Sequence, residues 1–223
     1  MSTLLLMKLF ETTPNRYDRG IRLLTGGQLD NFYDRVIVHV KEGDRVLDIG
    51  CGTGALTLRA AKKRAIVKAI DINPRMLDVA RAKAKKADFS QNIEFVEMGV
   101  AELGNEPDQT YDVVLCGLCL SELSKKELDF AVNEVSRILK PKGLFLVIDE
   151  TRPQRFLRRL LQGFFRSIFK LFVFLFSGTT TRALKNFQDR IEKAGFEVVS
   201  FQLNKSQNLL ELAARKIGIN PDE

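Results

Sequence analysis

The stretch VLDIGCGTGALTLRA, residues 46–60, decides the fold. In it an apolar run leads into glycines at positions 50, 52 and 54, and a helical pattern follows. We interpret 45–50 as a buried strand and 53–64 as a helix, which places the glycines in a strand-to-helix turn. Glycine lets the backbone approach a ligand closely, and the first turn of a helix offers free N–H groups. The stretch therefore predicts a ligand site at the carboxyl end of a strand.

Strands and helices alternate along the rest of the chain. Besides 45–50, the pattern predicts strands at 65–72, 92–100, 111–120, 141–150, 196–203 and 208–216. Besides 53–64, it predicts helices at 74–87, 124–140 and 184–194, with Asn73 and the Ser124/Glu127 pair as N-terminal caps. This order predicts an α/β fold with a doubly wound, mostly parallel, Rossmann-like sheet of seven strands. The link between the last two strands is too short for a crossover, so the last strand should be antiparallel.

Two acidic residues favour one ligand class over another. The glycine pattern does not match the G-x-G-x-x-G of dinucleotide sites, because Ala55 stands where the third glycine would be. Asp48 lies two residues before Gly50, where it would repel a pyrophosphate but suit an ammonium group. Asp71 ends the next strand, where a carboxylate can bind ribose hydroxyls. A ligand with both groups is S-adenosylmethionine (SAM); the alternative is a structural glycine turn in another α/β fold.

Five consecutive motifs then resemble those of class I SAM-dependent methyltransferases. They cover roughly residues 40–150 and read VLDIGCGTGALTLRA, AIDINPRML, EFVEMGVAEL, YDVVLCGLCLSEL and EVSRILKPKGLFLVIDE. The lead-in NRYDRGIRLLTGGQLDNFYDRVI, residues 15–37, resembles that of the ubiquinone/menaquinone-biosynthesis methyltransferases, and more weakly that of methyltransferases associated with corrinoid proteins. We therefore expect a helical cap over the cofactor at 1–40, a SAM-binding core at 41–150, an insertion at 151–186, and a C-terminal part at 187–223 that completes the sheet.

The resemblance implies a role for each matched residue. Gly50, Gly52 and Gly54 would line the methionine end of SAM, and Asp48 would face its ammonium directly or through water. Asp71 would hold the ribose. The remaining cofactor-site residues implied are Tyr17, Gly26, Gly27, Cys51, Ile72, Met76, Gly99, Val100, Ala101 and Cys116. One position departs from the family, because Val100 stands where an acidic residue usually holds the adenine amino group.

Cysteine and histidine counts limit other chemistry. The chain has three cysteines and one histidine, His39, which predicts neither a disulfide framework nor a histidine-based zinc site. Cys116 and Cys119 form a CxxC, for which a metal or redox role is the alternative to a place in the pocket wall. With a single histidine, the candidates for a general base are Glu122, Asp149, Glu150 and Tyr17. Each of them could instead be a solvated loop residue.

The net charge of +7 comes from one segment. Residues 151–188 hold no acidic residue and eight basic ones, which leaves 27 basic and 28 acidic residues elsewhere. Within this segment, apolar residues recur at helical spacing over 155–176, and basic residues occupy the other face. Its longest uncharged apolar run, Leu171–Phe176, is far shorter than the roughly 20 residues of a membrane span. We expect either an interfacial helix on an anionic membrane or a lid that packs on the sheet or on a second subunit.

Two functions remain open from the sequence. The first is a methyltransferase acting on a lipophilic small molecule, such as a quinol precursor or a lipid, in the cytoplasm or at the inner face of the membrane. The second is a methyltransferase-fold protein that works with a protein partner such as a corrinoid protein; an oligomer is also compatible. A nucleic-acid substrate is not expected, because CGLCLSEL replaces the N-P-P-[YF] motif after the fourth strand.

Overall fold

The computed structural model describes residues 14–25, 27–151, 184, 187–204 and 207–218. The helices are α2 (Pro14–Thr25), α3 (Gln28–Val36), α4 (Ala55–Lys62), α5 (Pro74–Lys86), α6 (Lys125–Ile138) and α8 (Phe187–Lys193). The strands are β1 (Arg45–Ile49), β2 (Ile66–Asp71), β3 (Ile93–Glu97), β4 (Tyr111–Gly117), β5 (Leu139–Glu150), β6 (Phe196–Leu203) and β7 (Leu209–Lys216). Short 3-10 helices lie at Ile37–His39, Ser90–Asn92, Val100–Asn105 and Leu120–Glu122.

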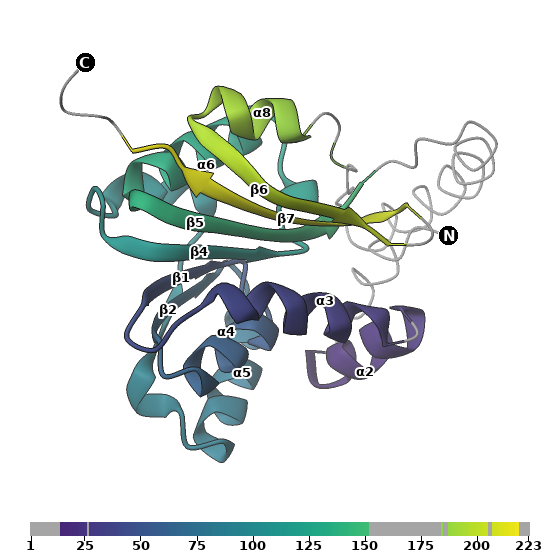
Figure 1. The fold of residues 1–223 in the computed structure, drawn as a ribbon. Helices are drawn as coiled ribbons and strands as arrows, with labels where there is room; N and C mark the ends of the chain where they lie inside the picture. Colours follow the sequence, from purple (N-terminus) through teal and green to yellow (C-terminus); the bar gives the residue numbers. More distant parts are fainter. Residues whose placement is uncertain (1–13, 26, 152–183, 185–186, 205–206, 219–223) are drawn as a thin grey trace.

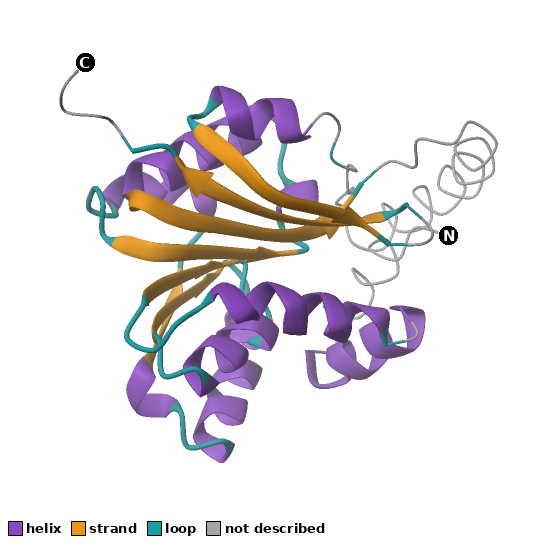
Figure 2. Cartoon of the chain, in the orientation of Figure 1, coloured by secondary structure: helices purple, strands orange, loops and turns teal. Residues whose placement is uncertain are grey.

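The seven strands form one sheet in the order β3-β2-β1-β4-β5-β7-β6. Strands β1 to β5 pair in parallel, and β7 runs antiparallel between β5 and β6. Helices α3, α4 and α5 lie on one side of the sheet, and α6 and α8 lie on the other (Figures 1 and 2). The predicted doubly wound, Rossmann-like fold and its antiparallel last strand are confirmed.

The sheet separates two apolar cores. Its α4 side buries Leu56 and Leu77 against strand residues such as Val67, and its α6 side buries Val135 and Ile191 in the second core. Burial of aliphatic side chains on both faces is typical of parallel strands, which explains their nearly continuous apolar runs.

Local signals in the sequence give the starts of α5 and α6. The Asn73 side chain accepts a hydrogen bond from the backbone N–H of Arg75, at 3.1 Å, at the start of α5. At the start of α6, Ser124 and Glu127 cap each other's backbone N–H groups, at 3.3 and 2.7 Å. Each cap satisfies donors that have no partner within the helix. These predicted caps are confirmed.

Three strand boundaries differ from the prediction by two residues or more. Strand β3 ends at Glu97, because Gly99 is already the N-cap of the 3-10 helix Val100–Asn105. Strand β4 ends at Gly117, because Leu118 has a positive φ of 64°, which turns the chain out of the sheet. Strand β5 begins two residues early, at Leu139, which pairs with Tyr111 across a register shift. The predicted helix at 155–176 lies outside the described residues.

Candidate functional site

A cavity of about 450 Å³ opens at the carboxyl ends of β1, β2 and β4. This is the edge of a doubly wound sheet where ligands bind. Of the cofactor residues predicted from the sequence, those that line it are Tyr17, Gly50, Gly52, Asp71, Ile72, Met76, Gly99, Val100 and Ala101. Residues from four separate motifs therefore meet in one cavity.

A second cavity, of about 410 Å³, lies on the side of helices α2, α3 and α4. Its lining shares Tyr17, Gly50, Gly52 and Gly117 with the first cavity and includes the predicted residue Cys51. Burial raises the pKa of the Cys51 thiol, so this sulfur stays protonated. The glycine turn and Tyr17 thus form the boundary between the two cavities.

The glycines of the turn serve different purposes. Gly50, Gly52 and Gly54 all have a positive φ, of 65°, 54° and 85°, which side chains rarely tolerate. A Cβ at Gly50 would lie 2.5 Å from the Cβ of Cys119, so the protein itself excludes a side chain there. A Cβ at Gly52 would meet no atom within 4 Å, so this backbone faces open space. Gly52 is the glycine whose place suits close approach of a ligand.

Asp71 holds the glycine turn in place. Its Oδ2 accepts a hydrogen bond from the backbone N–H of Gly52, and its Oδ1 accepts one from the N–H of Asn73, both at 2.8 Å. Each carboxylate oxygen can accept more than one hydrogen bond, so a ligand hydroxyl can share these oxygens with the backbone N–H groups. The Asp71 side chain therefore connects the end of β2, the turn after β1 and the cavity.

Asp48 lies beneath the turn and does not line either cavity. It is 1% exposed, and its Oδ2 accepts a hydrogen bond from the Thr57 hydroxyl at 2.5 Å. Burial raises the pKa of Asp48 from 3.8 to about 7. An interaction with a ligand ammonium would have to pass through the backbone of the turn or through water.

Three other predicted cofactor residues, Gly27, Gly54 and Cys116, do not line either cavity. Gly54 caps α4 and faces Ala80, while Gly27 precedes α3 with a φ of 74°. Cys116 is fully buried in the second core. Gly26 lies outside the described residues.

The two cysteines of the CxxC are in contact. Their Sγ atoms lie 2.6 Å apart, and the Cys119 thiol donates to the carbonyl oxygen of Ile49 at 3.3 Å. Both are free cysteines, and Cys119 rather than Cys116 lines the larger cavity. Burial raises the pKa of Cys116, and the hydrogen bond with Cys116 raises that of Cys119. Within the described ranges, no group of three or more His, Cys, Asp or Glu side chains is arranged to bind a metal ion.

The four candidate bases occupy different environments. Tyr17 and Glu122 line the larger cavity, and Glu122 is exposed. Asp149 and Glu150 are 0% and 2% exposed and do not line either cavity. The Asp149 carboxylate accepts the backbone N–H groups of Ser121, at 3.1 Å, and Glu150, at 2.6 Å, and burial raises its pKa from 3.8 to about 7. Asp149 thus orders the loop after β4, whereas Tyr17 and Glu122 can reach a substrate.

Some lining residues were not identified from the sequence. They include Asn73, Met98, Glu102, Gly117 and Leu118. Glu102 accepts the backbone N–H of Gly99 at 2.7 Å, three residues before it. This contact is one half of a capping box; Gly99 has no side chain for the other half, so the sequence carries no capping signature here. Glu102 lies two residues beyond Val100, the position where the family usually has an acid.

Known proteins match the same part of the chain. Residues 46–143 match a family model described as a methyltransferase domain. A demethylmenaquinone methyltransferase from Tropheryma whipplei is 33% identical over 164 residues, which cover 72% of this chain and 65% of the relative. The ubiquinone/menaquinone biosynthesis C-methyltransferase UbiE from Vibrio vulnificus is 31% identical over 152 residues, which cover 66% of this chain and 57% of the relative. The chain thus spans less than two thirds of the length of these relatives.

Solved structures share the fold. A SAM-dependent methyltransferase from Aquifex aeolicus superposes with a TM-score of 0.60 at 20% identity, over 83% of this chain and 89% of its own. The [4+2]-cyclase SpnF superposes with a TM-score of 0.68 at 20% identity, over 85% of this chain and 82% of its own. The matches confirm the predicted resemblance to methyltransferases over the matched residues. Residues 46–143 are therefore a methyltransferase domain, and the fold of the chain is that of SAM-dependent methyltransferases.

Proposed function

We propose that the chain is a SAM-dependent methyltransferase that methylates a lipophilic quinol precursor at a membrane surface. The observation that supports it best is the larger cavity, which lies at the carboxyl ends of the strands and is lined by Asp71, the open Gly52 backbone and apolar side chains. The names of the relatives give the acceptor class, because both are quinone-biosynthesis methyltransferases.

The described side chains suit SAM. Asp71 would accept the ribose hydroxyls, and the Gly52 backbone would approach the methionine end. Ile72 is 77% exposed and lines the cavity together with the buried Met76, so an adenine ring would cover apolar surface between them. When bound, SAM supplies a methyl group already activated by its sulfonium.

The protein then has three tasks during transfer. It must hold the acceptor in line with the methyl group, exclude water and accept any proton that the acceptor loses. We propose that Tyr17, at the boundary of the two cavities, positions the acceptor. Glu122 lines the cavity from the 3-10 helix that follows β4, and we propose it as the base.

Transfer of labelled methyl groups tests this function. The purified protein would be mixed with SAM carrying a labelled methyl group and with chemically reduced demethylmenaquinone. We expect label in the organic extract and a product heavier by one methylene group in mass spectrometry, with much less of both in the Asp71→Ala variant. Label that stays in the aqueous phase, from protein that binds SAM, would reject the quinol acceptor.

The membrane part of the proposal rests on the sequence of 155–176, outside the described residues. Each basic residue near an anionic surface contributes about 1 kcal/mol, and buried Phe side chains add to this. Among the described residues, no helix has the length and apolar composition to span a membrane. We therefore propose surface attachment through this segment.

Vesicle flotation tests the attachment. We expect the protein to float with vesicles of phosphatidylcholine and phosphatidylglycerol at low salt, and less so as salt rises. Replacing Phe164, Phe165 and Phe169 by Ser should release it. Phe130→Ser, at a half-exposed phenylalanine of α6, is the control and should float like the wild type. A wild type that stays at the bottom would favour a lid or subunit contact for 155–176.

A further inference from the structure

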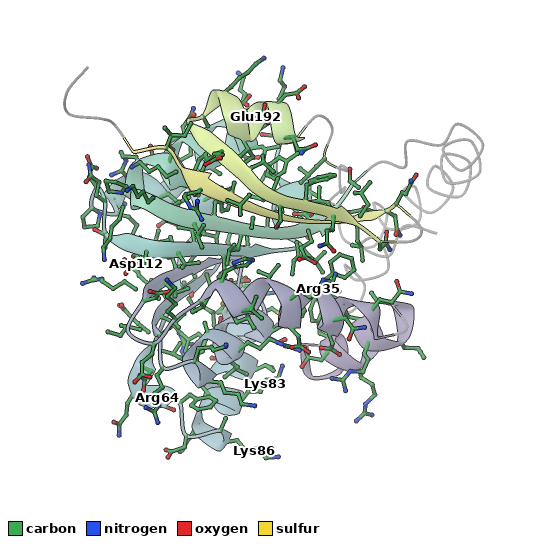
Figure 3. All side chains as sticks on the ribbon, viewed as in Figure 1. Arg35, Arg64, Lys83, Lys86, Asp112 and Glu192 are labelled. Atoms are coloured by element: carbon green, nitrogen blue, oxygen red, sulfur yellow. The ribbon has the colours of Figure 1, made fainter. Side chains whose placement is uncertain are left out.

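Asp18 of α2 connects three elements that are far apart in the sequence. The Thr53 hydroxyl donates a hydrogen bond to its Oδ1 at 2.5 Å. The Lys83 ammonium, at the end of α5, pairs with its Oδ2 and also donates to the carbonyl oxygen of Thr53 at 3.1 Å. Each of the three residues thus contacts the other two, and Figure 3 shows Lys83 on the α5 side of the molecule, below α3.

Thr53 is part of the glycine turn itself. It lies between Gly52 and Gly54 and is only 2% exposed. Asp71 fixes Gly52 from the β2 side, so Asp18 and Asp71 hold neighbouring residues of one turn from two directions. A change at Asp18 therefore acts on the backbone that borders both cavities.

Besides Asp18, helix α2 is held by Tyr17, which packs against the core on the α4 side, and by Arg22, which pairs with Asp30 of α3 at 3.0 Å. Among its described apolar side chains Ile21 is buried, while Leu23 is 83% exposed. Helices in proteins are stabilised mostly by packing of an apolar face, so a helix with little burial depends on its polar contacts. Tyr17 precedes Asp18 on this helix and lines both cavities, so the docking of α2 sets where Tyr17 lies.

We propose that Asp18 is a positioning residue for the cofactor: it docks α2 onto the glycine turn, which orders that turn and places Tyr17 over the SAM site. This rests on the proposed function, since it assumes that the larger cavity binds SAM. Asp18 and Lys83 are partly exposed, with side-chain exposures of 52% and 33%, so the ion pair alone contributes little. The hydrogen bond with the buried Thr53 hydroxyl adds to the contribution of the ion pair. Loss of both interactions should weaken SAM binding by about 10-fold.

Hydrogen exchange tests the contact without any cofactor. The variants are Asp18→Ala and Thr53→Val, which remove the acceptor and the hydroxyl donor. Thr53→Ser keeps the hydroxyl, and Arg19→Ala changes an exposed residue of the same helix. We expect amides of residues 17–25 to exchange about 10-fold faster in the first two variants, and as in the wild type in the other two.

Calorimetry with S-adenosylhomocysteine (SAH) and steady-state kinetics test the role. We expect Asp18→Ala and Thr53→Val to raise the Kd for SAH and the KM for SAM by about 10-fold with kcat within about twofold, while Thr53→Ser retains wild-type values. Unchanged exchange in both variants would refute the contact. Faster exchange with unchanged Kd and KM would refute the positioning role. A wild type that does not bind SAH would refute the proposed function, and the positioning role with it, whatever the exchange result.

Discussion

Removing the Asp71 carboxylate should weaken cofactor binding more than any other single change at the rim of the cavity. In the free protein Asp71 already accepts the N–H groups of Gly52 and Asn73, both at 2.8 Å. Hydrogen bonds to a charged group contribute about 1.5–3 kcal/mol each, and 1.4 kcal/mol corresponds to about tenfold in affinity. Asp71→Ala loses the order of the turn and the acceptor for the ribose, so the Kd for SAH should rise about 100-fold. Asp71→Asn keeps one acceptor oxygen, so its Kd for SAH should rise only about 10-fold.

Isothermal titration calorimetry with SAH measures this effect. The matched control is Asp78→Ala, which removes an exposed carboxylate of α5 that pairs with Arg81 at 3.2 Å. It should bind SAH like the wild type, because surface ion pairs contribute little. Thermal unfolding of each variant shows that the protein is folded at the temperature of titration. If Asp71→Ala binds SAH within about twofold of the wild type, the assignment of Asp71 to the ribose is refuted.

Three further predictions concern the glycine turn, the buried carboxyls and the candidate base. Gly50→Ala places a Cβ 2.5 Å from that of Cys119 at a φ of 65°, so we expect a loss of about 2–4 kcal/mol in unfolding free energy by urea titration; a loss below 0.5 kcal/mol would contradict it. Burial raises the pKa of Asp48 and Asp149 to about 7, so the stability gained from their protonated forms is complete below about pH 4 and lost as the pH rises through 7. Asp149→Asn should flatten this decline between about pH 4 and 7, and an unchanged slope would count against the shifted pKa. Glu122→Gln should lower kcat about 10- to 100-fold without changing the Kd for SAH, and an unaltered kcat would exclude Glu122 as the base.

The parts of the fold that follow from local chemistry could be predicted from the sequence. The caps at Asn73 and Ser124 depend on residues two or three positions away, and both occur as expected. The end of β4 could not be predicted, because the apolar letters continue past Gly117 while Leu118 takes a positive φ. A run of apolar residues predicts that the segment is buried, but it does not predict the residue at which the strand ends.

The candidate site, too, could be predicted only in part from the sequence. Motif spacing identified Asp71 and Gly52, which line the cavity together. Motif spacing could not show that Asp48 lies under the turn, where it accepts a hydrogen bond from Thr57, or that Asp149 is fully buried. Contacts such as that between Arg35 and Glu211, at 2.7 Å, join α3 to β7 across most of the chain, and no local pattern predicts such pairs (Figure 3 labels Arg35).

A crystal structure of the chain with SAH tests the central claim most directly. We predict SAH in the larger cavity, with its ribose hydroxyls within hydrogen-bonding distance of the Asp71 carboxylate. Its amino-acid end should lie over the Gly52 backbone, and its adenine should cover Ile72. SAH bound outside this cavity, or bound in it with the ribose away from Asp71, would contradict the account.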